Sequence, residues 1–246
     1  MIGRYYGPFS SLNDKQEVAI SQDGQKEAME HAGRTGGLPF VGVGWYRTEF
    51  DVPQFQAGKR ATILFDGAMS HANVYINGQK VGYWPYGYNS FHFDITKYLK
   101  PGEKNTLAVR LENLPESSRW YPGAGLYRNV HLIITEDAYI PVWGTYITTP
   151  SVNEKFAKVN VRTKVVLPEG ADPAKYSVET SVWNPNKQKL TAVRTSLAQM
   201  KYNNNQAEQE FVIQAPSLWS PEMPALYSAE TRLYEGDKLK DIYTTP

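Results

Sequence analysis

The segment Ala72-Asn-Val-Tyr-Ile-Asn-Gly-Gln-Lys-Val-Gly-Tyr-Trp84 contains the clearest structural signal in the chain. Its two apolar runs flank Asn77-Gly78, and an Asn-Gly pair tolerates the positive φ angles of a type I′ turn. The segment therefore predicts a tight β-hairpin, with strands from Ala72 to Ile76 and from Lys80 to Trp84.

Residues that alternate between apolar and polar types extend this β pattern along the chain. In the run 158–165, Val159, Val161, Thr163 and Val165 share one face, while the residues between them are polar. A period of two residues is typical of a strand with one buried face. The same pattern predicts strands at 107–111, 176–183, 207–213, 225–233 and 239–243, the last two joined across Glu235-Gly236-Asp237.

Helical periodicity is nearly missing from the sequence. The best helix candidate is Gln25–Ala32, which Gly33 could terminate. Closely spaced strand runs without intervening helices indicate an all-β fold of antiparallel sandwiches. We expect two sandwiches in tandem, covering residues 1–138 and 139–246, with the break near Asp137 to Pro141.

Composition excludes several classes of function. The 246 residues include 26 Lys and Arg against 25 Asp and Glu, so we expect no nucleic-acid partner and no membrane partner. Cysteine is absent, which excludes disulfides, thiol catalysis and thiolate metal sites. No run approaches the roughly 18 apolar residues that a membrane-spanning helix needs.

Motifs for catalysis or metal binding are also missing, so we expect no catalytic residue, metal site or cofactor in this chain. There is no Gly-x-Ser-x-Gly elbow, and the four histidines lack the i, i+4 spacing of a helical zinc site. His92 and His131 fall inside strand runs, where a structural role is the better interpretation. The acidic residues fall mostly in turns or on polar strand faces, as do Asp51, Glu112, Glu179, Glu208 and Glu210.

Two segments share a Gly-x-Gly turn followed by an apolar residue and Tyr-Arg: Gly42-Val-Gly-Trp-Tyr-Arg47 and Gly123-Ala-Gly-Leu-Tyr-Arg128. Arg stands where a dinucleotide fingerprint needs its third glycine, so a phosphate site is excluded. The segments are either two loop-to-strand corners braced by their arginines, or loops that open on the same end of a sandwich and line a ligand cleft.

Aromatic residues gather in Tyr83-Trp-Pro-Tyr-Gly-Tyr88 and Trp120-Tyr-Pro122, where Gly and Pro indicate loops. These rings either pack beneath the loops or against another domain, or they stack on the apolar face of a sugar. Arg119, beside Trp120, could then supply hydrogen bonds to sugar hydroxyls.

Six motifs, in this order, resemble family 2 glycoside hydrolases, and in particular the β-galactosidase branch. They match the sugar-binding N-terminal domain of that family. The second half of the chain resembles the family's immunoglobulin-like domain, including Trp219-Ser-Pro221 and Pro224-Ala-Leu-Tyr227. The six motifs are Gly42–Phe50, Phe65–Gly67, Val74–Gly82, Gly87–Thr96, Asn105–Arg110 and Ser118–Val130.

The resemblance implies a jelly-roll (galactose-binding-like) sandwich, then an immunoglobulin-like sandwich, then a catalytic TIM barrel. Family members are retaining exo-glycosidases, and both of their catalytic glutamates reside in the barrel. Neither glutamate has a matching position here. We therefore expect a non-catalytic N-terminal portion that is inactive alone, packs on a downstream barrel, and is itself incomplete before Gly7-Pro8-Phe9.

The resemblance also implies that two jelly-roll loops help to enclose the terminal sugar of a carbohydrate substrate. The matching positions are approximately His31 to Gly44 and Pro115 to Gly125. This chain has no Asn in the first and no Asp in the second, the residues that one family member supplies there. Our candidates for substrate binding are Arg34, Arg119, Trp120 and Tyr121.

Several alternatives stay open. The chain could be an independent carbohydrate-binding module with an immunoglobulin-like spacer, the front end of a β-glucuronidase or β-mannosidase, or a purely structural or adhesive pair of sandwiches. Linkage specificity and oligomeric state are undetermined. Localisation is also undetermined, with a periplasmic or secreted protein favoured and any signal peptide missing from the chain.

Overall fold

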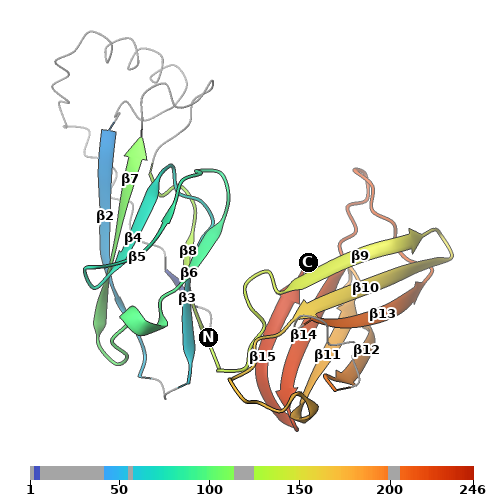
Figure 1. Ribbon diagram of the computed structural model, residues 1–246. Helices are drawn as coiled ribbons and strands as arrows, with labels where there is room; N and C mark the ends of the chain where they lie inside the picture. The colour runs from blue at the N-terminus through green and yellow to red at the C-terminus, as the bar shows by residue number, and fades with distance from the viewer. Residues whose placement is uncertain (1–2, 6–41, 55–57, 114–124, 199–205) are drawn as a thin grey trace. The chain divides into compact units, whose positions relative to one another are not determined.

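The protein is nearly all β, as the sequence predicts. A computed structural model describes residues 3–5, 42–54, 58–113, 125–198 and 206–246 (Figure 1). The chain divides into two units, Met1–Ile134 and Thr135–Pro246. Within the described ranges, helix is limited to two 3-10 turns, η1 (Thr96–Tyr98) and η2 (Pro173–Lys175), and neither of these could cross a membrane. The predicted helix Gln25–Ala32 lies outside the described residues.

The first unit is a jelly-roll sandwich of two sheets. One sheet has the order β1-β8-β3-β6 and the other the order β2-β7-β4-β5, so most neighbours in space are not neighbours in sequence. The strands are β1 (Gly3–Tyr5), β2 (Gly42–Asp51), β3 (Arg60–Phe65), β4 (Ala72–Ile76), β5 (Gln79–Trp84), β6 (Phe91–Asp94), β7 (Lys104–Asn113) and β8 (Val130–Thr135).

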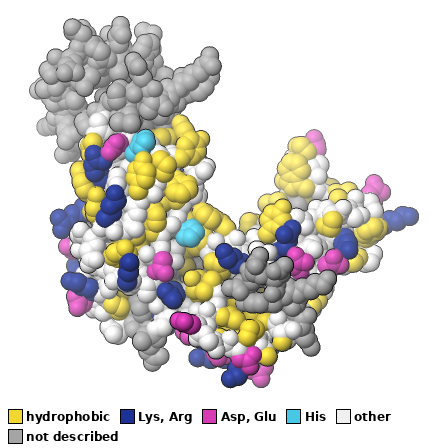
Figure 2. Space-filling model, in the orientation of Figure 1, with side chains coloured by type: hydrophobic (Ala, Val, Ile, Leu, Met, Phe, Trp, Pro, Cys, Tyr) yellow, Lys and Arg dark blue, Asp and Glu magenta, His cyan; other side chains and the backbone are white. Residues whose placement is uncertain are grey.

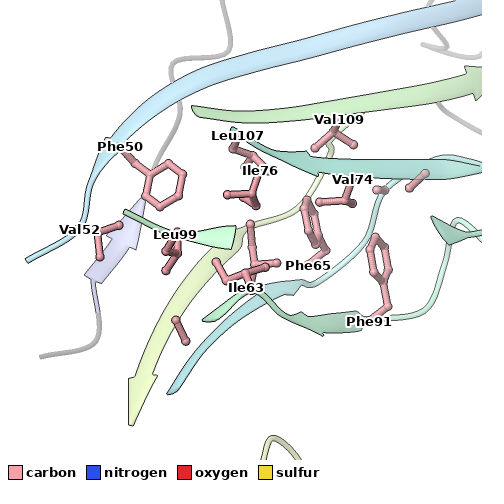
Figure 3. Close-up of a cluster of buried hydrophobic side chains, with 14 of the residues drawn as sticks. Phe50, Val52, Ile63, Phe65, Val74, Ile76, Phe91, Leu99, Leu107 and Val109 are labelled. Carbon is pink, nitrogen blue, oxygen red and sulfur yellow. The ribbon is translucent and has the colours of Figure 1, made fainter. Parts of the chain in front are cut away.

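A single apolar core lies between these two sheets (Figure 3). Strands β3 and β4 bury every second residue, because successive side chains of a strand point to opposite faces. Phe65 and Phe91 stack with ring centroids 4.8 Å apart, and Trp84 stacks on Phe91 at 5.6 Å. Burial of these rings and of the surrounding aliphatic side chains is the main stabilising contribution to this unit.

The predicted hairpin is confirmed by strands β4 and β5. Asn77 and Gly78 connect them with φ angles of 50° and 81°, the left-handed values that a type I′ turn needs. The Asn77 side chain also donates to the Tyr98 carbonyl at 2.9 Å and accepts from the Thr106 N–H at 2.9 Å. Asn77 therefore shapes the turn and fastens it to the neighbouring segments.

The second unit is an immunoglobulin-like sandwich. One sheet has the order β13-β10-β9 and the other β12-β11-β14-β15, as in seven-stranded immunoglobulin folds. The predicted inward face of the run 158–165 is confirmed, since Val159, Val161, Thr163 and Val165 are all less than 8% exposed. The strands are β9 (Thr145–Val152), β10 (Phe156–Lys164), β11 (Tyr176–Trp183), β12 (Lys189–Ser196), β13 (Gln206–Gln214), β14 (Ser228–Glu235) and β15 (Lys238–Thr245).

The first residues of the second unit are fastened to β15. The Lys240 ammonium lies 3.0 Å from the Asp137 carboxylate and 3.5 Å from that of Glu235. The N–H of Ile140 donates to the Asp241 carboxylate at 2.8 Å. The last strand of the unit thus holds its first segment in place.

Candidate functional site

The two loops that the sequence points to are attached to neighbouring strands. β2 begins at Gly42, directly after the first loop segment, and β7 ends at Asn113, directly before the second. Gly42 and Asn113 pair in the β2–β7 ladder. At the far end of the second segment, Gly125 forms two backbone hydrogen bonds of 3.0 Å with Met69. The attachment points therefore lie at one end of the first sandwich.

The substrate-binding candidates of the sequence analysis belong to those segments. Arg34, Arg119, Trp120 and Tyr121 fall within 6–41 and 114–124, outside the described residues. Their assignment to sugar binding stays a prediction. The site can be described from the residues that border the two segments.

The structure brings the two Gly-x-Gly motifs together. Gly125 has a φ of 88°, and a Cβ at this position would lie only 2.3 Å from the Tyr46 hydroxyl of the first motif. Glycine is needed here both for the left-handed backbone and for the close approach of Tyr46. Burial raises the pKa of the Tyr46 hydroxyl further above physiological pH, because desolvation disfavours the charged phenolate.

Arg128, in the second motif, fastens its own segment to the segment that follows β3. Its guanidinium donates to the Asp66 carbonyl at 3.3 Å and lies 5.1 Å from the centroid of the Tyr127 ring. The Tyr127 hydroxyl in turn donates to the Gly87 carbonyl at 2.8 Å. The two motifs thus lie at the same end of the sandwich. Arg128 braces a loop-to-strand corner, which is the first of the two interpretations that the sequence leaves open for these motifs.

A group of polar side chains lies next to these attachment points. Glu112, one residue before the end of β7, forms a short ion pair with Arg110. His71 Nδ1 lies 2.7 Å from the Tyr83 hydroxyl. Backbone hydrogen bonding between Glu112 and Ser70 connects the two pairs. Figure 2 shows a His side chain beside acidic and basic side chains and a hydrophobic patch on this unit.

The electrostatics of this group favour binding over proton transfer. The hydrogen bond from Arg110 is the main reason that the pKa of the Glu112 carboxyl is below its ordinary value. An acid with a lowered pKa is ionised at neutral pH and makes a poor general acid. Glu112 can instead accept hydrogen bonds, as from sugar hydroxyls.

An aromatic surface borders the polar group on the outer face of the β2-β7-β4-β5 sheet. Trp45 is 60% exposed and its ring centroid lies 5.6 Å from that of Tyr75. Trp45 is also the direct cross-strand partner of Arg110. An exposed ring beside a charged pair can contact either a sugar or another protein surface.

Sequence reasoning missed Glu112 and His71 as members of one group. The sequence analysis places Glu112 on a polar strand face, and the structure shows in addition that its side chain is 29% exposed and ion-paired with Arg110. The sequence pattern that could have predicted the ion pair is Arg110-x-Glu112, because residues two apart in a strand have their side chains on the same face. His71 lies 41 residues away in sequence, and only the sheet order brings it close.

The prediction for the first aromatic segment is partly wrong. Tyr83 and Trp84 belong to strand β5, as the hairpin prediction has it, so that only the assignment of these two residues to a loop is wrong. Trp84 packs on the core because the alternation of β5 turns it inward against Phe91. Tyr86 and Tyr88 do lie in the loop, are about half exposed and meet edge to face at 5.6 Å.

Two histidines have the structural positions that their strand context predicts. His131 Nε2 lies 3.0 Å from the Asp66 carboxylate, and partial desolvation lowers the pKa of His92, whose side chain is exposed. In the part of the chain that the structure describes, no three His, Asp or Glu side chains are close enough together to hold a metal ion.

Both halves of the chain match sequence models of one family. Residues 38–136 match "Glycosyl hydrolases family 2, sugar binding domain", and residues 139–246 match "Glycosyl hydrolases family 2". The two matches together leave out little beyond the first 37 residues.

Individual relatives agree with this match. The chain is 39% identical to the beta-galactosidase BoGH2A of Bacteroides ovatus, over 96% of this chain and 27% of that protein. It is 32% identical to a beta-glucuronidase of Bacteroides fragilis, over 83% of this chain and 31% of that protein.

A solved structure has the same fold. A glycosyl hydrolase family 2 member from Bacteroides cellulosilyticus superposes with a TM-score of 0.74 at 32% identity, covering 83% of this chain and 26% of that one. The chain thus spans between a quarter and a third of the length of these relatives. From its two matched domains and its two sandwiches, this chain belongs to glycosyl hydrolase family 2.

Proposed function

We propose that this chain is the non-catalytic N-terminal portion of a retaining, exo-acting β-galactosidase that hydrolyses terminal β-galactosides in carbohydrate metabolism. The observation that carries the proposal is the 39% identity to a β-galactosidase, over nearly all of this chain but only 27% of that enzyme. The remaining length of such an enzyme is ample for a TIM barrel, which typically needs about 250 residues.

In this proposal the loop-bearing end of the first sandwich faces the terminal sugar. Arg34, Arg119, Trp120 and Tyr121 contact the sugar, and the chain packs on the catalytic barrel. The convergence of Gly42, Asn113 and Gly125 at one end supports this role, because it fastens both loop segments to a rigid sheet. Loops held by a rigid scaffold are a common way to build a binding site.

The chemistry of retaining hydrolysis supports an inactive isolated chain. The reaction needs a carboxylic acid and a carboxylate about 5–5.5 Å apart, with the acid's pKa raised. Glu112, the acidic residue beside the loop attachments, has its pKa shifted in the opposite direction by Arg110. It is therefore suited to positioning and not to protonating a leaving group.

A second candidate is the corresponding portion of a β-glucuronidase. The observation that favours it is the 32% identity to a protein named beta-glucuronidase. Galactose and glucuronic acid differ in configuration at C4 and in substituent at C6, where galactose has a hydroxymethyl group and glucuronic acid a carboxylate. In this family the residues that distinguish a galactoside from a glucuronide are expected in the barrel. The two candidates therefore differ in their substrate and not in the role of this chain.

An assay of two polypeptides tests the proposal. The 246-residue chain and the product of its entire reading frame are incubated with p-nitrophenyl β-galactoside, β-glucuronide and β-mannoside. We expect no turnover by the chain, and turnover of the galactoside by the longer product if that frame encodes a barrel after Pro246. Hydrolysis by the 246-residue chain would overturn the proposal, and preference for the glucuronide would select the second candidate.

Variants of the longer product test the loop residues. Trp120→Ala and Arg119→Ala are expected to raise KM for the galactoside while the product remains folded. Trp219→Phe, in the second sandwich, is the control and is expected to leave KM unchanged. Unchanged KM in both loop variants would remove these residues from the site.

A further inference from the structure

A shallow pocket lies on the second unit, at one end of the β13-β10-β9 sheet. Its volume is about 320 Å³. It is lined by two aromatic rings (Trp143 and Tyr146), two cationic side chains (Arg162 and Lys164), the amide of Gln206, and Gly144.

The two aromatic rings are presented to solvent by a fixed backbone. Trp143 is 56% exposed and Tyr146 is 59% exposed. Trp143 has a φ of 56°, and its N–H donates to the Tyr243 hydroxyl at 2.9 Å. The next residue, Gly144, donates to the Pro141 carbonyl at 2.7 Å and accepts from the Lys164 N–H at 2.6 Å. Trp143 thus combines a left-handed backbone with a ring that is more than half exposed, and non-glycine residues in such conformations cluster at functional sites.

The charges on this face of the sheet are unevenly compensated. Along β10, Lys158 pairs with Glu210 at 3.2 Å and Arg162 pairs with Glu208 at 3.6 Å. Lys164 lies opposite Gln206, so its cross-strand partner is an uncharged amide. No ion pair found among the described residues includes Lys164. Positive charge is therefore in excess at the end of the sheet where the pocket lies.

The second cation of the pocket is oriented by an aromatic ring. The Arg162 guanidinium lies 5.1 Å from the centroid of the Tyr146 ring, within the range of a cation–π contact. Its ion pair with Glu208 is long and exposed, and such pairs are weak. Arg162 can therefore turn toward a bound anion at little cost.

We propose that this pocket binds an anionic sugar unit, such as a uronic acid residue of an acidic glycan. The apolar face of the ring would stack on Trp143 or Tyr146, and its carboxylate would face Lys164, with Arg162 as the second cation. The amide of Gln206 would hydrogen-bond a ring hydroxyl. This proposal concerns the second sandwich alone and does not depend on which substrate the proposed enzyme hydrolyses.

Binding of two isosteric sugars to the 246-residue chain tests the proposal. Methyl β-glucuronide and methyl β-glucoside differ only in the carboxylate at C6, and their affinities can be compared by ligand-observed NMR. We expect the glucuronide to bind about fivefold more tightly or better, the ratio that an exposed charge pair of about 1 kcal/mol provides. The preference should diminish at high salt, because salt screens exposed charges.

Substitutions inside and outside the pocket show which residues produce the preference for the glucuronide. Lys164→Gln is expected to abolish the preference for the glucuronide, and Trp143→Ala to weaken the binding of both sugars. Lys158→Gln is the control, because it removes a cation from the same strand face outside the pocket. Far-UV circular dichroism establishes that each variant is folded.

Four results would overturn the proposal. They are equal affinities for the two sugars, absence of binding by the folded wild-type chain, equal effects of the Lys158 and Lys164 substitutions, and displacement by acetate with the same affinity as the glucuronide. The last result would mean that the pocket binds a bare anion and makes no use of its aromatic rings. Glucose 6-sulfate distinguishes the kind of anion, since binding of both acidic sugars supports a shared anionic-sugar site.

Discussion

The charge of the buried Lys240 ammonium is stabilised by its carboxylate partners. Its side chain is only 8% exposed and lies between the carboxylates of Asp137 and Glu235. Burial alone would lower the pKa of this ammonium, but the two carboxylates outweigh burial and raise it. Loss of either partner would leave a buried charge poorly compensated, which costs more than the ion pair itself contributes.

Protonation of Asp137 is therefore expected to destabilise the second unit. The hydrogen bond from Lys240 is the main reason that the pKa of the Asp137 carboxyl is lowered. A carboxyl with a lowered folded-state pKa contributes stability above its unfolded pKa, near 3.9, and this contribution is lost as pH falls through the folded value. We expect the free energy of unfolding to decline below about pH 4, and Asp137→Asn to reduce that decline.

Urea unfolding at pH 7 and pH 3 measures this effect, with Tyr and Trp fluorescence as the probe. Asp237→Asn is the control, since the Asp237 side chain is fully exposed. If Asp137→Asn loses as much stability between the two pH values as the wild type does, the Lys240 pair is not responsible.

Residue types predict local turns better than they predict a site. Asn77-Gly78 specified its turn because both residues tolerate left-handed φ angles. The Glu112 and His71 group, by contrast, depends on the pairing of β7 with β4, which no local pattern reveals. The predicted sugar contacts, Arg119 among them, came from the resemblance and stay predictions.

Strands were predictable where one face is buried and the other exposed. β10 and β13 alternate between buried and exposed residues along most of their length, and both were expected. β12 was not expected, because it lies at the edge of its sheet and none of its residues is fully buried. The predicted run 225–233 was too long at its start, since β14 begins at Ser228.

Within β5, Gly82 allows the two sheets of the first sandwich to approach each other. A Cβ at this position would lie 2.3 Å from the nearest ring carbon of Phe93. We expect Gly82→Ala to lower the free energy of unfolding by about 1–3 kcal/mol, the usual cost of overpacking. Chemical denaturation of the purified chain measures the difference.

A double-mutant cycle tests the reason for that loss. In a Phe93→Leu background the ring is gone, so Gly82→Ala should cost clearly less than it does in the wild type. Equal costs in the two backgrounds would mean that contact with Phe93 is not the cause.

At the scale of the whole molecule, each unit has its own buried side chains. Among the described residues, the core of the first unit draws on residues from 46 to 134, and the two clusters of the second unit draw on residues from 138 to 243. The cores therefore share no residue. The all-β class and the two sandwiches could be predicted from the alternation and turn patterns, and the jelly-roll and immunoglobulin-like types from the resemblance.

Separate cores predict that a core substitution acts on its own unit. Phe65 and Leu233 are fully buried in the first and second units. Phe65→Ala should lower the stability of the first unit by about 3–5 kcal/mol, and Leu233→Ala that of the second by about 2–5 kcal/mol. Hydrogen exchange followed by mass spectrometry resolves the two units. Loss of amide protection across both units in either variant would contradict the prediction.

The pairing of Gly42 with Asn113 has a consequence for how this domain can diversify. Residues 6–41 and 114–124 are attached to the two members of one cross-strand pair, in a ladder whose register is fixed by ten such pairs. Insertions, deletions or new side chains in either segment leave those pairs in place. Natural variation can therefore remodel both segments independently, while their points of attachment stay a constant distance apart.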